Sequence, residues 1–269
     1  MIRKLAVFLI FTSSLFAGPK TLKMGHFYGG NTYAFSETDR RTLSDGEEVD
    51  YPYNSFAAHY LTLVGSPHDR VDIYANLPYV QAREPVNPDI DQNQFSDLNT
   101  GIKFAILQNT FLDLALTADV KIPVSDYETN LHTSIGNGQT DYSAMVDIGK
   151  DIAFLWYQSF AMQAGYRHRT DEPPNEVFGS FSYTAFLTSF MSVGLFISHS
   201  EALGGLNLGN PGWNLNNLNI DFTTAGGKLA FYLINHILIE GSYSQTIRST
   251  NSVIFRNLGV HVGFYGKIF

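Results

Sequence analysis

The sequence predicts an all-β protein, a transmembrane antiparallel up-and-down β-barrel of about twelve strands. The first observation is a one-for-one alternation of apolar and polar residues, as in LDLALTADVKIP at 112–123, which is the period of a β-strand with two unlike faces. The second is that short and long connections alternate along the chain, as in bacterial outer-membrane barrels. The third is composition. Charged residues make up 16% and aromatic residues 14%, so part of the outer surface is expected to face something other than water.

The first residues, MIRKLAVFLIFTSSLFAG, have the pattern of a secretory signal peptide. Arg3 and Lys4 precede a short apolar run, and the small residue Ala17 suits a cleavage site. The run is too short to anchor the chain in a bilayer. We therefore expect residues 1–17 to be a signal peptide that is removed on export, and residues 18–269 to form a single barrel domain. The alternative is a buried N-terminal helix.

Twelve segments are expected to be strands. In chain order they are roughly 19–37, 55–64, 71–83, 98–107, 112–123, 140–149, 152–169, 178–190, 192–202, 218–234, 237–248 and 253–269. Most of them show the period of two clearly, but segment 55–64 fits either parity. In segment 218–234 the apolar parity changes, which predicts a bulge or bend at Gly226 and Gly227.

The connections between these segments differ in length on the two sides of the predicted barrel. Short turns are expected near Gly65–Arg70, Gln108–Thr110, Gly149–Asp151, Phe190–Ser192 and Asn235–His236. Longer loops are expected near Thr38–Asn54, Glu84–Asp97, Val124–Gln139, Thr170–Val177 and Leu203–Asn217, with a tighter one near Ser249–Ser252. An even number of strands returns the chain to its starting side, so both ends are expected on the short-turn side, which would be periplasmic.

Alternation alone does not separate a membrane barrel from a soluble β-barrel or sandwich, in which the apolar face points inward. Aromatic residues near strand ends favour the membrane, because they suit interfacial girdles; they are Tyr79, Tyr142, Phe154, Trp156 and Tyr166. The last residues, LGVHVGFYGKIF, resemble the C-terminal signature of outer-membrane barrels, with Tyr265 and Phe269 fitting it and Lys267 departing from it. The expected partners are therefore outer-membrane lipid and, through Phe269, the barrel assembly machinery of a Gram-negative bacterium.

If the apolar face meets lipid, the opposite face lines the lumen. The lumen-facing candidates are Asp72, Lys103, Asp113, Asp119, Lys121, Asp147, Arg167, Arg169, Asp221 and Glu240. These side chains either line an open pore and set its selectivity, or pair across strands and fill a narrow interior. The chain has no cysteine, and no cofactor or metal site is expected. Without a basic cluster and with a net charge of −8, nucleic acid is not an expected partner.

One stretch carries a more specific resemblance: VKIPVSDYETNLHTSIGNGQTDYSAMVDIGKDI, residues 120–152. The matching pattern is Lys121-Ile122-Pro123, then Ser125-Asp126-Tyr127, then Gly136, Gly138, Asp141-Tyr142 and Ile148-Gly149-Lys150. It is similar to a family of outer-membrane transporters labelled for a MetA pathway of phenol degradation, although Ser125 stands where that family usually has Gly. The resemblance covers roughly residues 70–269. It implies a barrel of about this size and passage of small, apolar or aromatic compounds.

The sequence thus favours a channel for small solutes, whose identity the sequence does not give, and not an enzyme. One alternative is a structural or adhesive outer-membrane barrel without transport. A more remote alternative is a lipid hydrolase, because His132, Ser134 and Asn137 could supply a base, a nucleophile and a third polar group. These three residues lie in a Gly-rich loop, which is a poor support for catalysis.

Overall fold

The computed structural model describes residues 18–83, 91–109, 111–127, 135–136, 138–154, 156–171, 174–212, 218–233 and 236–267. In this part of the chain the regular elements are strands, and all of their pairings are antiparallel. In order they are β1 (His26–Thr42), β2 (Glu48–His68), β3 (Val71–Arg83), β4 (Gln92–Phe95), β5 (Asp97–Leu107), β6 (Asp113–Pro123), β7 (Asp141–Phe154), β8 (Trp156–Arg169), β9 (Glu176–Thr188), β10 (Met191–Ala202), β11 (Asp221–Leu233), β12 (Ile237–Thr250) and β13 (Val253–Lys267). No helix in the described part of the chain could cross a membrane.

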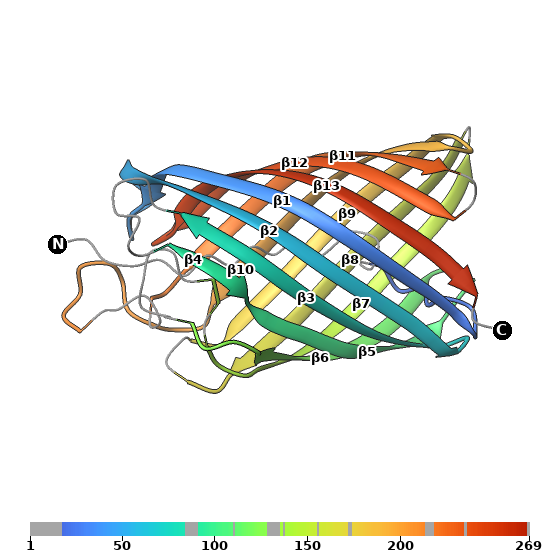
Figure 1. The fold of residues 1–269 in the computed structure, drawn as a ribbon, viewed down its shortest axis with the longest axis horizontal. Coiled ribbons are helices and arrows are strands. Elements are labelled where there is room, and N and C mark those ends of the chain that lie inside the picture. Colours follow the sequence, from blue (N-terminus) through green and yellow to red (C-terminus); the bar gives the residue numbers. More distant parts are fainter. Residues whose placement is uncertain are drawn as a thin grey trace.

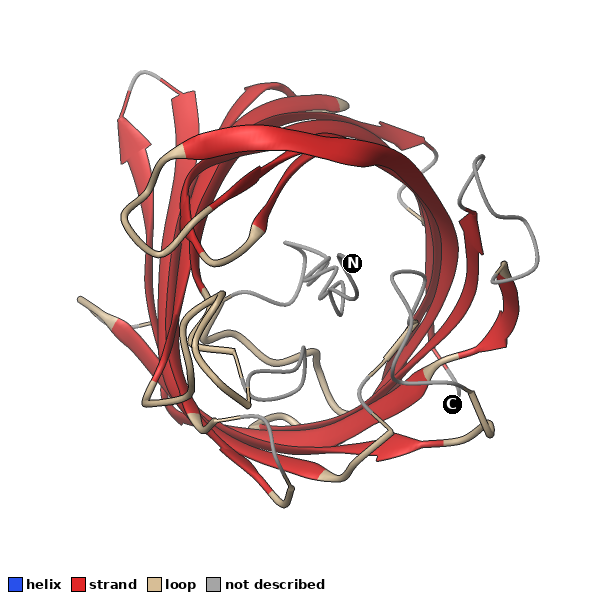
Figure 2. Cartoon of the chain, turned by 90° about the vertical axis from the view of Figure 1, so that its left-hand side faces the viewer, coloured by secondary structure: helices blue, strands red, loops and turns tan. Residues whose placement is uncertain are grey.

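The sheet closes on itself through a seam between its first and last strands. Each strand pairs with its neighbour in sequence, and β1 pairs with β13 from His26 opposite Lys267 to Arg41 opposite Val253. Strands β4 and β5 are separated only by Ser96, and both pair with β3, so together they count as one strand of the barrel. The predicted twelve-strand up-and-down barrel is therefore confirmed (Figures 1 and 2).

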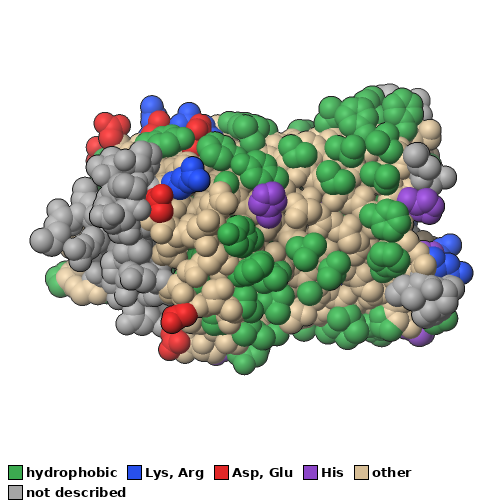
Figure 3. Space-filling view, viewed as in Figure 1, with side chains coloured by type: hydrophobic (Ala, Val, Ile, Leu, Met, Phe, Trp, Pro, Cys, Tyr) green, Lys and Arg blue, Asp and Glu red, His purple; other side chains and the backbone are tan. Residues whose placement is uncertain are grey.

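The outer wall is apolar, as strand β6 illustrates. Leu112, Leu116 and Ile122 are 40%, 48% and 39% exposed, whereas Asp113 and Thr117 are buried on the inner face. Apolar side chains are scattered over the whole length of the wall, and charged side chains gather at its ends (Figure 3). A monomer in water rarely exposes more than a few hundred Å² of contiguous apolar surface. The two faces of β6 are therefore arranged as in a membrane barrel and opposite to a soluble one, with leucines toward lipid and carboxylates toward the lumen.

Several predicted strand boundaries are wrong. The first strand begins at His26, not at residue 19, because residues 18–25 lie against the inner wall. Strand β7 does not turn at Gly149–Asp151 but continues to Phe154, with Asp151 opposite Ser159 of β8. Strand β1 extends to Thr42 and strand β2 begins at Glu48, so the connection expected over Thr38–Asn54 is shorter than predicted.

The bulge predicted at Gly226 and Gly227 is also wrong. Strand β11 pairs with β10 in unbroken register, and the shift against β12 falls between Thr223 and Thr224. The apolar parity changes because Phe222 lies on the inner face, opposite the buried Ser200 of β10. Near the end with the long connections, the interior is partly apolar. The prediction did not anticipate this, because it assigned every apolar residue of a strand to the lipid face.

Candidate functional site

The candidate site is the barrel interior, where the structure places nine of the ten predicted side chains. Six lie on the wall from β3 to β7 and three on β8 and β12; they are Asp72, Lys103, Asp113, Asp119, Lys121, Asp147, Arg167, Arg169 and Glu240. Asp221 departs from the prediction and faces outward. It pairs with Glu201, which is exposed, while the adjacent Ser200 is buried inside. Phe222 is the reason. It was expected to face lipid, which would place the odd positions beside it inside the barrel, but Phe222 faces the interior and Asp221 therefore faces outward.

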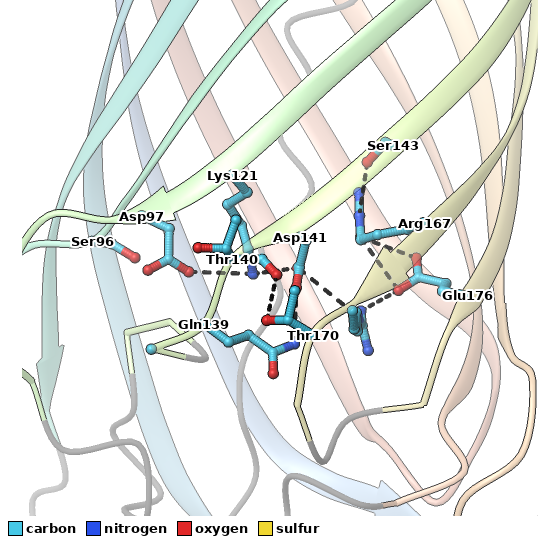
Figure 4. A network of polar contacts seen from close by, with 12 residues as sticks. Ser96, Asp97, Lys121, Gln139, Thr140, Asp141, Ser143, Arg167, Thr170 and Glu176 are labelled. Carbon is cyan, nitrogen blue, oxygen red and sulfur yellow. Dashed lines mark hydrogen bonds and ion pairs between the residues drawn. The ribbon is translucent and has the colours of Figure 1, made fainter.

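At the long-connection end, charged side chains form a network along the inner wall from β5 to β9 (Figure 4). The Lys121 ammonium lies 3.3 Å from the Asp97 carboxylate and 2.7 Å from that of Asp141. Arg169 bridges Asp141 and Glu176, and Arg167 lies 3.3 Å from Glu176. Three carboxylates thus face three cations. The network is therefore balanced in charge.

Sequence reasoning missed the three carboxylates of this network. Asp97 and Glu176 were placed in loops because the strand starts were set too late, and each is in fact the first residue of its strand. Asp141 could have been found from the sequence, since it lies in the predicted strand 140–149 with the same odd parity as Asp147, and all five odd positions from 141 to 149 are buried. A shift of strand ends by one or two residues was enough to hide the ion pairs.

Halfway down the same wall, the carboxylates are held by neutral donors. Thr117 and Gln163 donate hydrogen bonds of 2.6 and 2.8 Å to Asp147, and Tyr74 donates one of 3.0 Å to Asp119. These carboxylates are therefore part of cross-strand contacts.

At the short-turn end, residues 18–25 form what we call the N-terminal strap. The backbone N–H of Leu22 donates to Asp72 at 3.1 Å, and the Lys103 ammonium donates to the Gly18 carbonyl at 2.6 Å. The Lys20 ammonium pairs with Asp151 and lies 3.7 Å from Asp113. The strap thus contacts the inner wall from β3 to β7, at the right-hand end of Figure 1. Three of the predicted lumen residues, Asp72, Lys103 and Asp113, therefore contact the N-terminal strap.

The strap requires a gap among the side chains of the wall that it contacts. A Cβ added to Gly149 of β7 would lie 2.6 Å from the Pro19 ring, closer than real Cβ atoms approach. This glycine, which the sequence suggested as a turn residue, is instead an inward strand position that leaves room for the strap.

Deletion of residues 19–24 is expected to raise single-channel conductance several-fold, because it exposes the inner wall that the strap covers. The deletion touches no strand pair, so the barrel should still fold, which its heat-dependent gel mobility would show. Lys20→Ala is the matched control. The Lys20 side chain is 42% exposed, and ion pairs of such exposed side chains contribute at most about 1 kcal/mol, so conductance should change little. Equal conductance in the parent and the deletion variant would contradict a role of the strap in limiting the pore.

A separate arc of the interior, near the long-connection end, is apolar. Ala34, Phe56, Ala58, Tyr60, Val80 and Ala82 of β1 to β3 are buried in one cluster. Tyr127 and Ile135, two described residues of the connection between β6 and β7, complete it. A second connection, between β10 and β11, contributes Leu218 to a cluster with Tyr51 and Val253. Figure 2, viewed from this end, shows described connections reaching inward over part of the barrel opening.

Tyr127 joins the apolar arc to the charged network. Its hydroxyl donates to Asp97, accepts a 2.9 Å hydrogen bond from the Gly138 backbone N–H, and lies where a Cβ on Gly136 would collide with it. Burial, and then the neighbouring Asp97 carboxylate, raise the pKa of the Tyr127 hydroxyl above its usual value, so this group stays a donor. The Ser96 hydroxyl fixes the other side of the loop by donating to the Ile135 carbonyl.

The hydrolase alternative falls on His132, Ser134 and Asn137, which lie outside the described residues, so their geometry adds nothing to it. Among the residues that the structure does describe, no cluster of three or more His, Asp or Glu side chains could hold a metal ion.

A closed antiparallel barrel with an apolar outer wall and a charged interior is an outer-membrane β-barrel. Residues 28–205 match the model of a family described as "Putative MetA-pathway of phenol degradation", and the chain belongs to this family. No curated protein sequence matches the chain.

Solved structures share the fold at low sequence identity. The COG4313 outer membrane channel from Pseudomonas putida F1 superposes with a TM-score of 0.74 at 14% identity, over 92% of this chain and 98% of that one. The NanC porin gives 0.51 at 11% identity, over 85% and 98%. A deletion mutant of the TodX monoaromatic hydrocarbon channel gives 0.50 at 9%, over 96% and 94%. At these identities the likeness establishes the fold alone.

Proposed function

We propose that the protein is an outer-membrane channel for small apolar or aromatic solutes. The observation that carries this is the apolar arc inside a membrane barrel, formed by Phe56, Tyr60, Val80 and their neighbours. Apolar side chains turned toward the interior of such a barrel have no lipid to meet, and they are the surface that an apolar solute would contact. Family membership, and fold relatives titled as an outer membrane channel and a monoaromatic hydrocarbon channel, support the same function.

The route to the membrane is part of the proposal. Residues 1–17, which have the signal-peptide pattern, and Phe269, the contact proposed for the assembly machinery, lie outside the described residues. Export followed by assembly in the outer membrane would place the short turns and both ends of the barrel in the periplasm.

Conductance of the refolded protein in planar bilayers, together with uptake of phenol, toluene and benzoate by liposomes containing it, tests the proposal. Ionic conductance and faster uptake than by protein-free liposomes are expected. No conductance and no added uptake, in either the parent or the strap deletion, would overturn the proposal and favour the structural barrel without transport. Release of fatty acid from outer-membrane lipid would instead support the hydrolase.

A further inference from the structure

We propose that the inner face of β9, β10 and β11 is a second solute site, which binds small uncharged molecules that carry several hydroxyl groups, such as neutral monosaccharides. This inference goes beyond the proposed function, because it assigns a different class of solute to a part of the interior outside the apolar arc. Charged sugars, and solutes without hydroxyl groups, do not belong to the class. We call the site the hydroxyl face; it consists of Ser180, Ser182 and Thr184 of β9, Phe196 and Ser198 of β10, and Thr224 of β11.

Three hydroxyl groups lie side by side in one row of the hydroxyl face. Ser198 of β10 is paired with Ser180 of β9 on one side and with Thr224 of β11 on the other. Their side chains face the interior, because Ser198 shares the parity of Ser200, whose hydroxyl donates to the buried Glu176. Residues directly opposite each other in an antiparallel pair have Cβ atoms roughly 4.5–5.5 Å apart. The row therefore presents three adjacent hydroxyl groups to one small molecule.

The hydroxyl groups of this face are open to the lumen and are not used to hold the barrel together. The side chains that carry them are half-buried, whereas every inner position from Tyr28 to Thr38 of β1 and from Asp141 to Gly149 of β7 is buried. Within the part of the chain that the structure describes, none of these hydroxyls forms a hydrogen bond with the protein. A hydroxyl offers one donor and two acceptor positions. The face therefore has hydrogen-bonding capacity that a solute with several hydroxyl groups can use.

An aromatic ring lies beside the hydroxyl row. A Cβ added to Gly226 of β11 would lie 2.5 Å from the Cζ atom of Phe196, so the ring lies along the wall in the space that this glycine leaves free. The ring is half-buried and presents a face to the lumen, with Ser182 opposite it on β9. The negative face of an aromatic ring attracts weakly positive C–H groups such as those of a sugar ring. Gly226, which the sequence suggested as a bulge, thus provides the space for Phe196.

Charge excludes ionic solutes from the class. Inward charged side chains of these strands are already paired, since Lys228 lies 3.4 Å from Glu240 and Glu176 lies 3.3 Å from Arg167. An ion would lose hydration at this face without gaining an opposite charge. A neutral solute hydroxyl instead replaces the hydrogen bonds of a bound water. Such an exchange gives weak binding, which conduction requires, because the solute must also leave.

Binding can be measured on the refolded full-length protein by saturation-transfer NMR, with three probes. Glucose is the uncharged sugar, gluconate adds a carboxylate, and a sulfobetaine of similar mass has no hydroxyl group. We expect glucose to bind with a dissociation constant in the millimolar range, and the other two to bind at least several-fold more weakly. Swelling of liposomes that contain the protein measures uptake of the same three solutes, and it should be fastest with glucose.

Substitutions in the hydroxyl face test the residues. Ser198→Ala, in the middle of the row, should weaken glucose binding by roughly two- to ten-fold, the contribution of one neutral hydrogen bond. Adding Ser180→Ala and Thr224→Val should weaken it further, and Phe196→Ala alone should weaken it several-fold. The removed hydroxyls leave no partner in the protein unpaired, so heat-dependent gel mobility should be unchanged. Ser36→Ala is the matched control, because Ser36 faces the interior from β1 but is fully buried, and it should bind glucose as the parent does.

The outcomes separate this site from the proposed channel. Equal binding of glucose and the sulfobetaine, or unchanged glucose binding by folded Ser198→Ala and Phe196→Ala, would show that the hydroxyls only hydrate the wall, and would overturn the inference. Added uptake of toluene without binding of glucose would also overturn it and leave the channel for apolar solutes in place. A protein that binds glucose through these residues but conducts and transports nothing would keep the site and overturn the channel.

Discussion

Asp141→Asn is expected to destabilise the barrel by roughly 3 kcal/mol, the lower end of the range for breaking a buried ion pair. Asp141 is fully buried and lies 2.7 Å from the Lys121 ammonium and 3.9 Å from Arg169. The substitution leaves two carboxylates against three cations in a wall that was balanced. Asp97 and Glu176 still face the remaining cations, which keeps the loss at the low end. Urea unfolding in lipid vesicles, followed by tryptophan fluorescence or gel mobility, measures it.

The double variant Asp141→Asn with Lys121→Met shows whether charge balance is the cause. It removes one charge of each sign, so it should be more stable than Asp141→Asn alone, and the cycle of single and double variants gives the coupling between the two groups. Asp126→Asn, at an exposed loop position, should have almost no effect. If the double variant loses more unfolding free energy than the two single variants lose together, packing and not charge stabilises this wall.

Leu116→Arg is expected to destabilise the barrel in bilayers by roughly 2–4 kcal/mol, the cost of a cation facing lipid near the midplane. Leu116 is 48% exposed on the outer face, in the middle of β6. The same measurement of unfolding in vesicles applies.

Leu112→Arg is the depth control on the same face. Leu112 directly precedes β6 at its short-turn end, where an interfacial cation costs only about 0–1 kcal/mol. Equal losses at the two positions would place the hydrocarbon elsewhere on the barrel.

The sequence predicted those parts of the fold that repeat with a short period. The alternation in 112–123 gave both the strand and the face of Asp113, Asp119 and Lys121, because side chains in a strand must alternate. It failed at residues 19–25, which look strand-like but are held by Asp72 and by Ser66, some fifty residues away in a chain whose local pattern carries no trace of them.

The sequence predicted most of the residues that face the interior, but not which of them form ion pairs. Lys121 was assigned to the lumen, yet its partner Asp97 fell beyond a strand end that sequence reasoning fixes poorly. The packing of Tyr127 against β1 to β3 was out of reach, since these strands lie far from it in the sequence, and the resemblance named Tyr127 only as part of a motif. The assignment of Asp221 to the lumen was wrong because the neighbouring Phe222, expected to face lipid, faces the interior.

The seam between β1 and β13 sets how this barrel must assemble. Across it, the Tyr28 hydroxyl contacts His261, which also contacts Thr32 at 2.7 Å, although the first two residues are 233 positions apart. The entropic cost of closing a loop grows with its length, so this pairing is the costliest in the chain to bring together. Until it forms, β1 and β13 are two long free edges, able to add a strand from any other chain. Slow closure would therefore show as edge-to-edge aggregation before it shows as lost stability.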